Sequence, residues 1–232
     1  MNFERKIARI AGTLFIIGTV AGILSIAPAI DAPDYLTKAS ENANQVLKGA
    51  FFQFIMAVAY IGFAILLYPI LRRYNESLAI GFVGFRFIAG VFNIIGVTSI
   101  LLLLTLSQEF TKAPNLNSSY FHTLGELLLA GRDFVDHVAM ILAQSIGSIM
   151  CYYILYQTML VPRWLSVWGL AGATLTIFAS FLVMFHLIGI ITPVYLALLL
   201  PLALQEMFLA VWLIVKGFNQ SVVIFENSRT AY

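Results

Sequence analysis

Gly81-Phe82-Val83-Gly84-Phe85-Arg86-Phe87-Ile88-Ala89-Gly90 places an arginine inside a run of apolar residues that extends from about residue 78 to residue 106. Such a run is longer than the roughly 20 residues that a helix needs to cross a bilayer. An arginine at the centre of a membrane helix costs about 2.5–3.5 kcal/mol on insertion scales, so it normally faces the bundle interior, beside an acid or a wet cavity. The stretch therefore predicts a transmembrane helix whose arginine needs a buried partner.

The composition sets the class of the whole chain. Of its 232 residues, 61% are hydrophobic and 10% are charged, and the mean hydropathy is +0.93. These values are typical of a polytopic membrane protein, and they leave no stretch for a separate soluble domain. We predict one membrane domain over residues 1–232, an all-α bundle of six transmembrane helices. The spans are expected at about residues 7–27, 49–71, 78–106, 134–157, 165–188 and 193–215, with external loops at 28–48 and 107–133. The first loop is expected to lead into an amphipathic helix that continues into the second span, and the second loop is expected to hold a short helix at the membrane interface.

The basic residues predict the orientation of this bundle. With six spans, eight Lys and Arg residues fall on the side of the two chain ends and four fall on the other side. Because basic residues concentrate in cytoplasmic segments, both termini are predicted to be cytoplasmic. The first set is Arg5, Lys6, Arg9, Arg72, Arg73, Arg163, Lys216 and Arg229, and the second is Lys38, Lys48, Lys112 and Arg132.

The best candidate partner for Arg86 is Glu206, in the sixth apolar run. Arg86 lies eight residues from the predicted cytoplasmic end of its span and Glu206 lies nine residues from the end of its own, so both are about 12–14 Å deep at ~1.5 Å per residue. Asn93 shares the helical face of Arg86, and Gln205 precedes Glu206. We predict that these four are buried polar residues. A structural ion pair that fixes helix register is the leading interpretation, and a functional cavity is the alternative.

A second polar group is predicted near the external boundary of the membrane. Two histidines with carboxylates on separate helices are chemically able to bind zinc and activate a water molecule, which makes Asp136, His137 and His186 candidate metal ligands. The chain has no His-Glu-x-x-His motif and no histidine pair at i, i+4, so a structural role at the interface is favoured. Haem ligation by His137 and His186, or proton-linked transport, are further alternatives. The full group is Gln53, Asp133, Asp136, His137 and His186.

The sequence contains no recognisable catalytic motif. It has no glycine-rich phosphate loop at a strand–helix junction, no nucleophile elbow, and no serine or cysteine with an obvious base. We therefore predict no catalytic residue and no cofactor, and the scattered basic residues argue against nucleic acid. The expected partners are the lipid bilayer and an unidentified small ligand or protein, and a homo-oligomer stays open.

The leading functional interpretation is a non-enzymatic membrane component with a binding or regulatory role. One alternative is a small-solute or ion/proton-linked transporter that uses Arg86 and Glu206. The other is an intramembrane metal-dependent hydrolase that uses His137, His186 and Asp136.

Short motifs along nearly the whole chain resemble a bacterial multi-pass membrane family, domain of unknown function 4386. They lie at residues 5–12 (RKIARIAG), 68–73 (YPILRR), 84–86 (GFR), 161–165 (VPRWL), 204–206 (LQE) and 212–218 (WLIVKGF). Arg86 and Glu206 match charged positions of that pattern. The resemblance implies a multi-pass protein of the bacterial cytoplasmic membrane and no established activity, cofactor or substrate.

Overall fold

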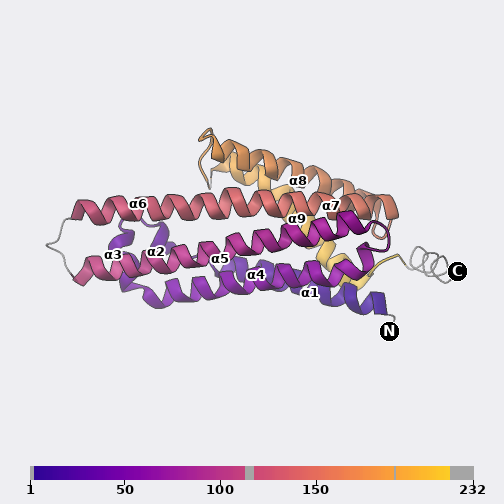
Figure 1. The fold of residues 1–232 in the computed structure, drawn as a ribbon, viewed down its shortest axis with the longest axis horizontal. Coiled ribbons are helices and arrows are strands. Elements are labelled where there is room, and N and C mark those ends of the chain that lie inside the picture. The colour runs from indigo at the N-terminus through magenta and orange to yellow at the C-terminus, as the bar shows by residue number, and fades with distance from the viewer. Residues whose placement is uncertain (1–2, 113–117, 191, 220–232) are drawn as a thin grey trace.

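The computed structural model describes residues 3–112, 118–190 and 192–219, and the regular structure in these segments is helical (Figure 1). Six helical segments are long and apolar enough to cross a membrane. The predicted all-helical fold with six spans is therefore confirmed. The segments are α1 (Phe3–Leu24), α4 (Ala43–Leu71), α5 (Glu76–Lys112), the continuous stretch Ser118–Thr158, α8 (Arg163–Met184) and α9 (Pro193–Val215).

The stretch Ser118–Thr158 has three parts. It begins as α6 (Ser118–Phe134), passes through a π-helical segment, η1 (Val135–Met140), and continues as α7 (Ile141–Thr158). A π-helix closes wider turns than an α-helix and is found mostly as a local bulge, often at functional sites. The two short helices are α2 (Pro28–Asp31) and α3 (Tyr35–Glu41).

The six spanning segments form a closed ring. In order around the bundle, α1 packs on α4, α4 on α5, α5 on α7, α7 on α8, α8 on α9, and α9 again on α1. Glycines allow the closest approaches: a Cβ at Gly12 of α1 would lie 2.5 Å from the carbonyl oxygen of Ala210, and one at Gly172 of α8 would lie 2.9 Å from the backbone of Leu202. Small residues at such contacts are typical of helices packed in membranes.

The outer surface of the ring is apolar. Large hydrophobic side chains point away from the bundle, among them Phe178 and Phe208, which are both 55% exposed. A contiguous apolar surface of this kind is what a lipid environment requires and water does not favour. The chain is therefore a multi-pass membrane protein.

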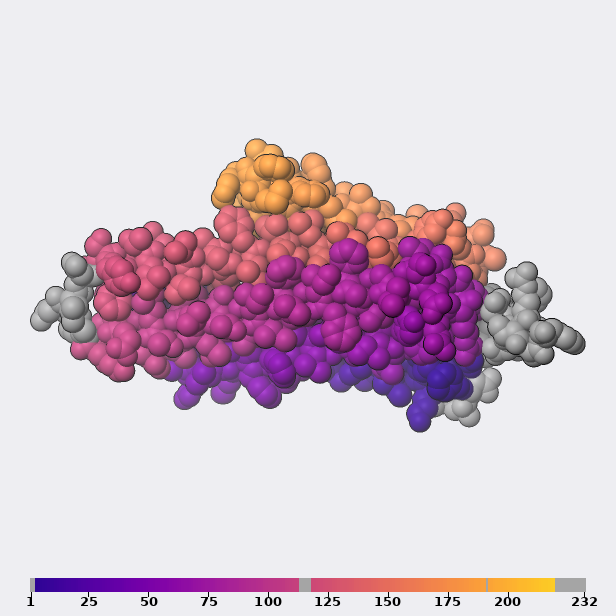
Figure 2. Space-filling view, in the orientation of Figure 1, coloured from indigo at the N-terminus to yellow at the C-terminus, as the bar shows by residue number. Residues whose placement is uncertain are grey.

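Two segments are much longer than the membrane is thick. At about 1.5 Å per residue, the 37 residues of α5 extend over ~55 Å and the 41 residues of Ser118–Thr158 over ~60 Å, whereas α8 and α9, with 22 and 23 residues, extend over only ~33–35 Å. The extra length projects at one end of the molecule, beyond α8 and α9 (Figures 1 and 2). We call this projecting part, made of α2, α3, the first turns of α4, the end of α5 and most of α6, the headpiece.

The headpiece has its own hydrophobic core. Ile30, Leu36, Val46 and Leu103 are almost completely buried there, and Phe121 and Leu128 of α6 pack against them. Ser107 joins α5 to α3, since its hydroxyl donates to the carbonyl of Leu36 at 2.7 Å and accepts from the amide of Ser40 at 2.8 Å.

The headpiece differs from the predicted external loops 28–48 and 107–133. Residues 107–112 and 118–133 are helical, residues 113–117 lie outside the described residues, and 28–48 holds α2, α3 and the start of α4. The helices are longer than the predicted short interfacial helix, because apolar residues at helical spacing, such as Phe110, Phe121 and Leu129, give each of them a face that packs on its neighbours. The phenol of Tyr35 lies in this packing, and its burial, together with the nearby Glu126 carboxylate, raises its pKa.

The opposite end of the molecule carries both ends of the described chain. The start of α1 and the end of α9 lie there beside the α4–α5 turn and the α7–α8 turn (Figure 1). Arg73, after α4, forms an ion pair with Glu4 of α1 at 3.3 Å, and the amide of Asn219 donates to the carbonyl of Leu160 at 2.9 Å. That this end faces the cytoplasm stays a prediction, and of the basic residues behind it, Arg229 lies outside the described residues.

Candidate functional site

Arg86 of α5 and Glu206 of α9 meet across the interior of the ring. The Arg86 Nη2 atom donates to Glu206 Oε1 at 3.2 Å and to the hydroxyl of Ser148 in α7 at 2.9 Å. The side chains are 2% and 8% exposed, so the pair is buried inside the bundle. Three helices of the ring thus converge on one guanidinium.

Aromatic rings and a phenol complete the surroundings of this ion pair. The Arg86 Cζ atom lies 5.8 Å from the ring centres of Tyr60 and Phe63 and 5.7 Å from that of Phe82, distances at which a cation is attracted to an aromatic face. Tyr152 donates its hydroxyl to Glu206 Oε1 at 3.5 Å. These contacts hold the charge in place, which fits a role in fixing how α5, α7 and α9 pack.

The two other buried polar residues predicted with the pair lie in different directions. Gln205 turns toward α8, where its Nε2 donates to the carbonyl of Leu165 at 3.0 Å. Asn93 lies on the same side of α5 as Arg86. Arg86 and Asn93 both line a small cavity of about 10 Å³ between α4, α5 and η1–α7. The predicted group therefore divides into an ion pair with a neighbouring asparagine, and a separate contact between α9 and α8.

The predicted external-side cluster also divides in two. In the first half, Gln53 of α4 donates from Nε2 to both carboxylate oxygens of Asp136, at 3.3 Å each, and Nδ1 of His137 hydrogen-bonds with the hydroxyl of Tyr195 at 2.9 Å. Both Asp136 and His137 belong to η1. Gly96 of α5 makes room for this arrangement, because a Cβ there would collide with Asp136 Oδ1.

The second half of the predicted cluster faces another cavity. Asp133 and His186 line a pocket of about 190 Å³ between the end of α6 and the α8–α9 connection. His186 lies past the end of α8, which stops at Met184 rather than at residue 188, and it has a left-handed backbone with φ 56°. Its ring packs edge-on against Phe134 at 5.7 Å.

The candidate metal ligands are consequently not gathered. His137 and Asp136 face one cavity and His186 faces the other. Within residues 3–112, 118–190 and 192–219, no group of three or more His, Cys, Asp or Glu side chains is arranged to hold a metal ion. The single cysteine, Cys151, is buried in the core.

A large cavity with several charged and polar side chains in its wall lies where the ring meets the headpiece. It has a volume of about 460 Å³ and is bounded by the end of α1, by α4, α5 and η1, and by the start of α9. Asp136, His137 and Met140 of η1 line it, together with Ile141, the first residue of α7. The extra residue in each π turn sets the direction of these side chains, and nothing in the sequence pattern signals such a turn.

The charges around this cavity do not balance. Arg132 lines it but is already engaged, with Nη2 at 2.7 Å from Asp31 Oδ1 and at 3.0 Å from Asp133 Oδ1. Asp136 lines it with only the neutral amide of Gln53 as a hydrogen-bond donor, and in the described part of the chain no Lys, Arg or His lies within ion-pairing distance of it. The cavity therefore presents a carboxylate without a cationic partner, in walls formed mainly by Met56, Ile100, Ile141, Ile190 and Leu199.

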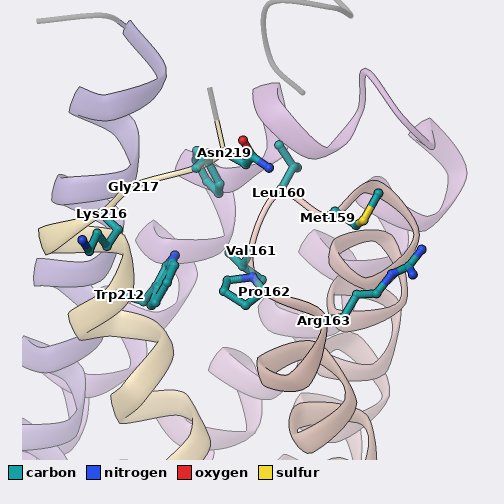
Figure 3. A pocket seen from close by; sticks show the side chains of 10 residues that line it. Met159, Leu160, Val161, Pro162, Arg163, Trp212, Lys216, Gly217 and Asn219 are labelled. Carbon is teal, nitrogen blue, oxygen red and sulfur yellow. The ribbon is translucent and has the colours of Figure 1, made fainter. Parts of the chain in front are cut away.

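A further cavity of about 530 Å³ lies at the opposite end of the bundle, between the α7–α8 turn and the end of α9 (Figure 3). Its two basic residues do not converge: Lys216 and Arg163 lie on opposite sides of the cavity, and the guanidinium of Arg163 lies 5.5 Å from the ring centre of Tyr156. Val161, Pro162 and Trp212 form its walls. Lys216 and Arg163 are therefore not placed to bind one anionic group of a ligand together.

The family model described as Domain of unknown function (DUF4386) matches residues 10–217. The chain belongs to the DUF4386 family. The matched range holds both buried polar groups of this DUF4386 chain, the Arg86–Glu206 pair and the Asp136 cavity. No curated protein and no solved structure matches the chain.

Proposed function

We propose that this protein is a non-enzymatic ligand-binding component of a bacterial cytoplasmic membrane, and that its ligand is an organic cation with an apolar body. The observation that carries the proposal is the Asp136 carboxylate, which η1 directs into a cavity of about 460 Å³ and which lacks a cationic partner among the described residues. Ligand sites of about 300–1,000 Å³ with apolar walls and a few placed polar groups are typical of small-molecule binding.

The chemistry of the cavity supports a cation over an anion or a neutral solute. A carboxylate in surroundings of low dielectric is stabilised by an opposite charge, and that attraction is stronger there than in water. Gln53 orients Asp136 by donating to both oxygens, while His137 is held by Tyr195. Met56, Met140 and the surrounding aliphatic residues offer polarisable and adaptable walls for a ligand of variable shape.

A matched pair of probes tests this proposal. Tetraphenylphosphonium and tetraphenylborate have almost the same shape and opposite charge, so their binding to the purified protein in lipid nanodiscs separates charge from hydrophobicity. We expect saturable binding of the phosphonium, measured by equilibrium dialysis against protein-free nanodiscs, and an affinity loss of about tenfold or more in Asp136→Asn, since a charged pair is worth at least ~1.4 kcal/mol in such surroundings.

The control variant is Glu109→Gln, which removes an exposed headpiece carboxylate that pairs with Lys112 at 2.8 Å. It is expected to bind the phosphonium as the unmodified protein does. Equal binding of the phosphonium and the borate, or equal affinity of Asp136→Asn, would contradict the proposal.

A transport role for small solutes or ions is the second candidate. It is favoured by one observation: polar residues continue from the cavity into the ring, through Gln53 and Asn93, toward the Arg86–Glu206 pair. Uptake of radiolabelled tetraphenylphosphonium into proteoliposomes with an imposed pH gradient tests it. Accumulation that depends on the gradient and is absent in Glu206→Gln would support transport, and gradient-independent binding alone would support the simple binding role.

A further inference from the structure

A small polar cavity lies deeper in the ring than the proposed cation site. It has a volume of about 10 Å³ and is lined by Tyr60, Arg86, Asn93, Met140 and Gln144, among others. A cavity of roughly 10–15 Å³ is about the smallest that holds one water molecule, provided that several polar atoms face it. Its size alone thus excludes most other guests.

The side chains around this cavity have unused hydrogen-bonding capacity. Arg86 donates through Nη2 to Glu206 and Ser148, but its Nε and Nη1 atoms have no hydrogen-bond partner in the described segments. The Oδ1 atom of Asn93 lacks a partner there as well. Arg86 and Asn93 are each only 3% exposed. Buried donors and acceptors are nearly always satisfied, by protein or by ordered water, because leaving them unpaired is costly.

We propose that one water molecule is bound between Arg86 and Asn93, where it accepts a hydrogen bond from the guanidinium and donates one to Asn93 Oδ1. Two donors and one acceptor in a cavity of single-water size match what a buried water requires. A neutral guest is favoured over an anion because Glu206 already neutralises Arg86 at 3.2 Å.

This water joins the ion pair to the outer cavity. The Nε2 atom of Gln53 lies 3.4 Å from the backbone oxygen of Asn93 and also donates to Asp136. Gly96, which lies beside Asp136, is ten positions after Arg86 in α5, so the row of polar groups from Arg86 to Asp136 extends over about 15 Å. Met140 lines both cavities, and a methionine side chain is flexible enough to open or close a contact between them.

The other side of the ion pair is dry. Toward the end of the molecule that carries the chain termini, Leu67, Phe82, Leu155 and Leu209 form part of the continuous hydrophobic core. Hydration of Arg86 therefore comes from the side of the Asp136 cavity. The inference concerns the interior of the ring and holds whether or not the outer cavity binds a cation.

Water-edited solid-state NMR on the full chain in lipid vesicles, labelled with 13C,15N-arginine and 13C-alanine, tests the proposal. Arg86→Lys assigns the Arg86 signals by their loss. The exposed guanidinium of Arg163 serves as the hydrated reference, and the methyl group of Ala79, which is 0% exposed, serves as the dry reference. We expect magnetisation from water to reach Arg86 well before it reaches Ala79.

Asn93→Leu removes the acceptor and keeps the number of side-chain heavy atoms, with larger apolar methyl groups in place of the amide, so early transfer to Arg86 should be lost. Ser166→Ala, a control in α8 that also removes a buried hydroxyl without a described partner, should leave the transfer unchanged. Transfer to Arg86 no faster than transfer to Ala79 in the unmodified protein would overturn the proposal, and this comparison decides the matter even where Asn93→Leu does not fold.

Discussion

Gln53 and Asp136 form a forked contact in which one amide nitrogen lies 3.3 Å from each oxygen of the carboxylate. The contact lies directly over Gly96, the α5 residue whose missing side chain leaves space for both groups. The contact thereby joins α4, α5 and η1, three segments distant in sequence, in one wall of the Asp136 cavity. The position of Asp136 consequently depends on a glycine that carries no chemistry of its own.

Gly96→Ala should disrupt the contact between Gln53 and Asp136. The added methyl group would collide with Asp136 Oδ1 and lie 2.7 Å from Gln53 Nε2, so the carboxylate has to move. We expect a loss of about 1–3 kcal/mol in stability, as for overpacking of a filled interior, together with weaker tetraphenylphosphonium binding. Thermal unfolding in detergent and equilibrium dialysis measure the two effects.

Gly84→Ala is the matched control on the same helix, because a Cβ at that position meets nothing within 4 Å. It should leave binding unchanged and stabilise α5 by up to about 0.5–1 kcal/mol, since alanine loses less backbone entropy than glycine. Equal losses in Gly84→Ala and Gly96→Ala would contradict the placement of Asp136.

The Arg86–Glu206 pair should show strong energetic coupling. Removing one partner leaves an uncompensated buried charge, so Arg86→Met and Glu206→Gln are each expected to cost about 3–5 kcal/mol. The double variant should lose much less than the sum of the single losses. The fraction of folded protein, measured by size-exclusion fluorescence in detergent over a temperature series, provides the comparison. Strictly additive losses would rule out the pair.

The depth of Arg86 and Glu206 was accessible from the sequence because the rise per residue of a helix is constant. Both lie a similar number of residues from the same end of the bundle, and the structure brings them to 3.2 Å. The ring order of the helices, which makes α5 and α9 face each other, depends on contacts such as Gly12 with Ala210 that no local pattern specifies.

The outer site was less accessible for two physical reasons. A π turn changes the direction of every side chain within it, so the regular helical period over residues 134–157 does not show which groups Asp136 and His137 face. His186 falls past the end of α8 in a left-handed conformation, which a hydrophobic run cannot reveal. In 107–133 the sequence predicts a short interfacial helix but not its full length, because the many polar residues there obscure the apolar face that packs in the headpiece core.

The headpiece should loosen independently of the membrane ring. Ser107→Ala removes the hydrogen bond to Leu36 and the one from Ser40, two bonds that join α5 to α3, at a cost of about 0.5–1.5 kcal/mol each. We expect faster amide hydrogen exchange in α3, with unchanged exchange in α8 and α9. Ser99→Ala is the control, because that hydroxyl bonds only within its own helix, to Ile95.

The predicted orientation of the chain in the membrane can be tested by cysteine labelling from the outside of the cell. Lys38 is exposed in the headpiece and Ser77 is exposed at the α4–α5 turn, at the opposite end of the molecule. If the excess of basic residues places the termini in the cytoplasm, Lys38→Cys should react with a membrane-impermeant maleimide on intact cells, and Ser77→Cys should react only after permeabilisation. The native Cys151 is 2% exposed and is not expected to contribute to either signal. The reverse labelling pattern would place the Asp136 cavity on the cytoplasmic side, and its cation would then come from inside the cell.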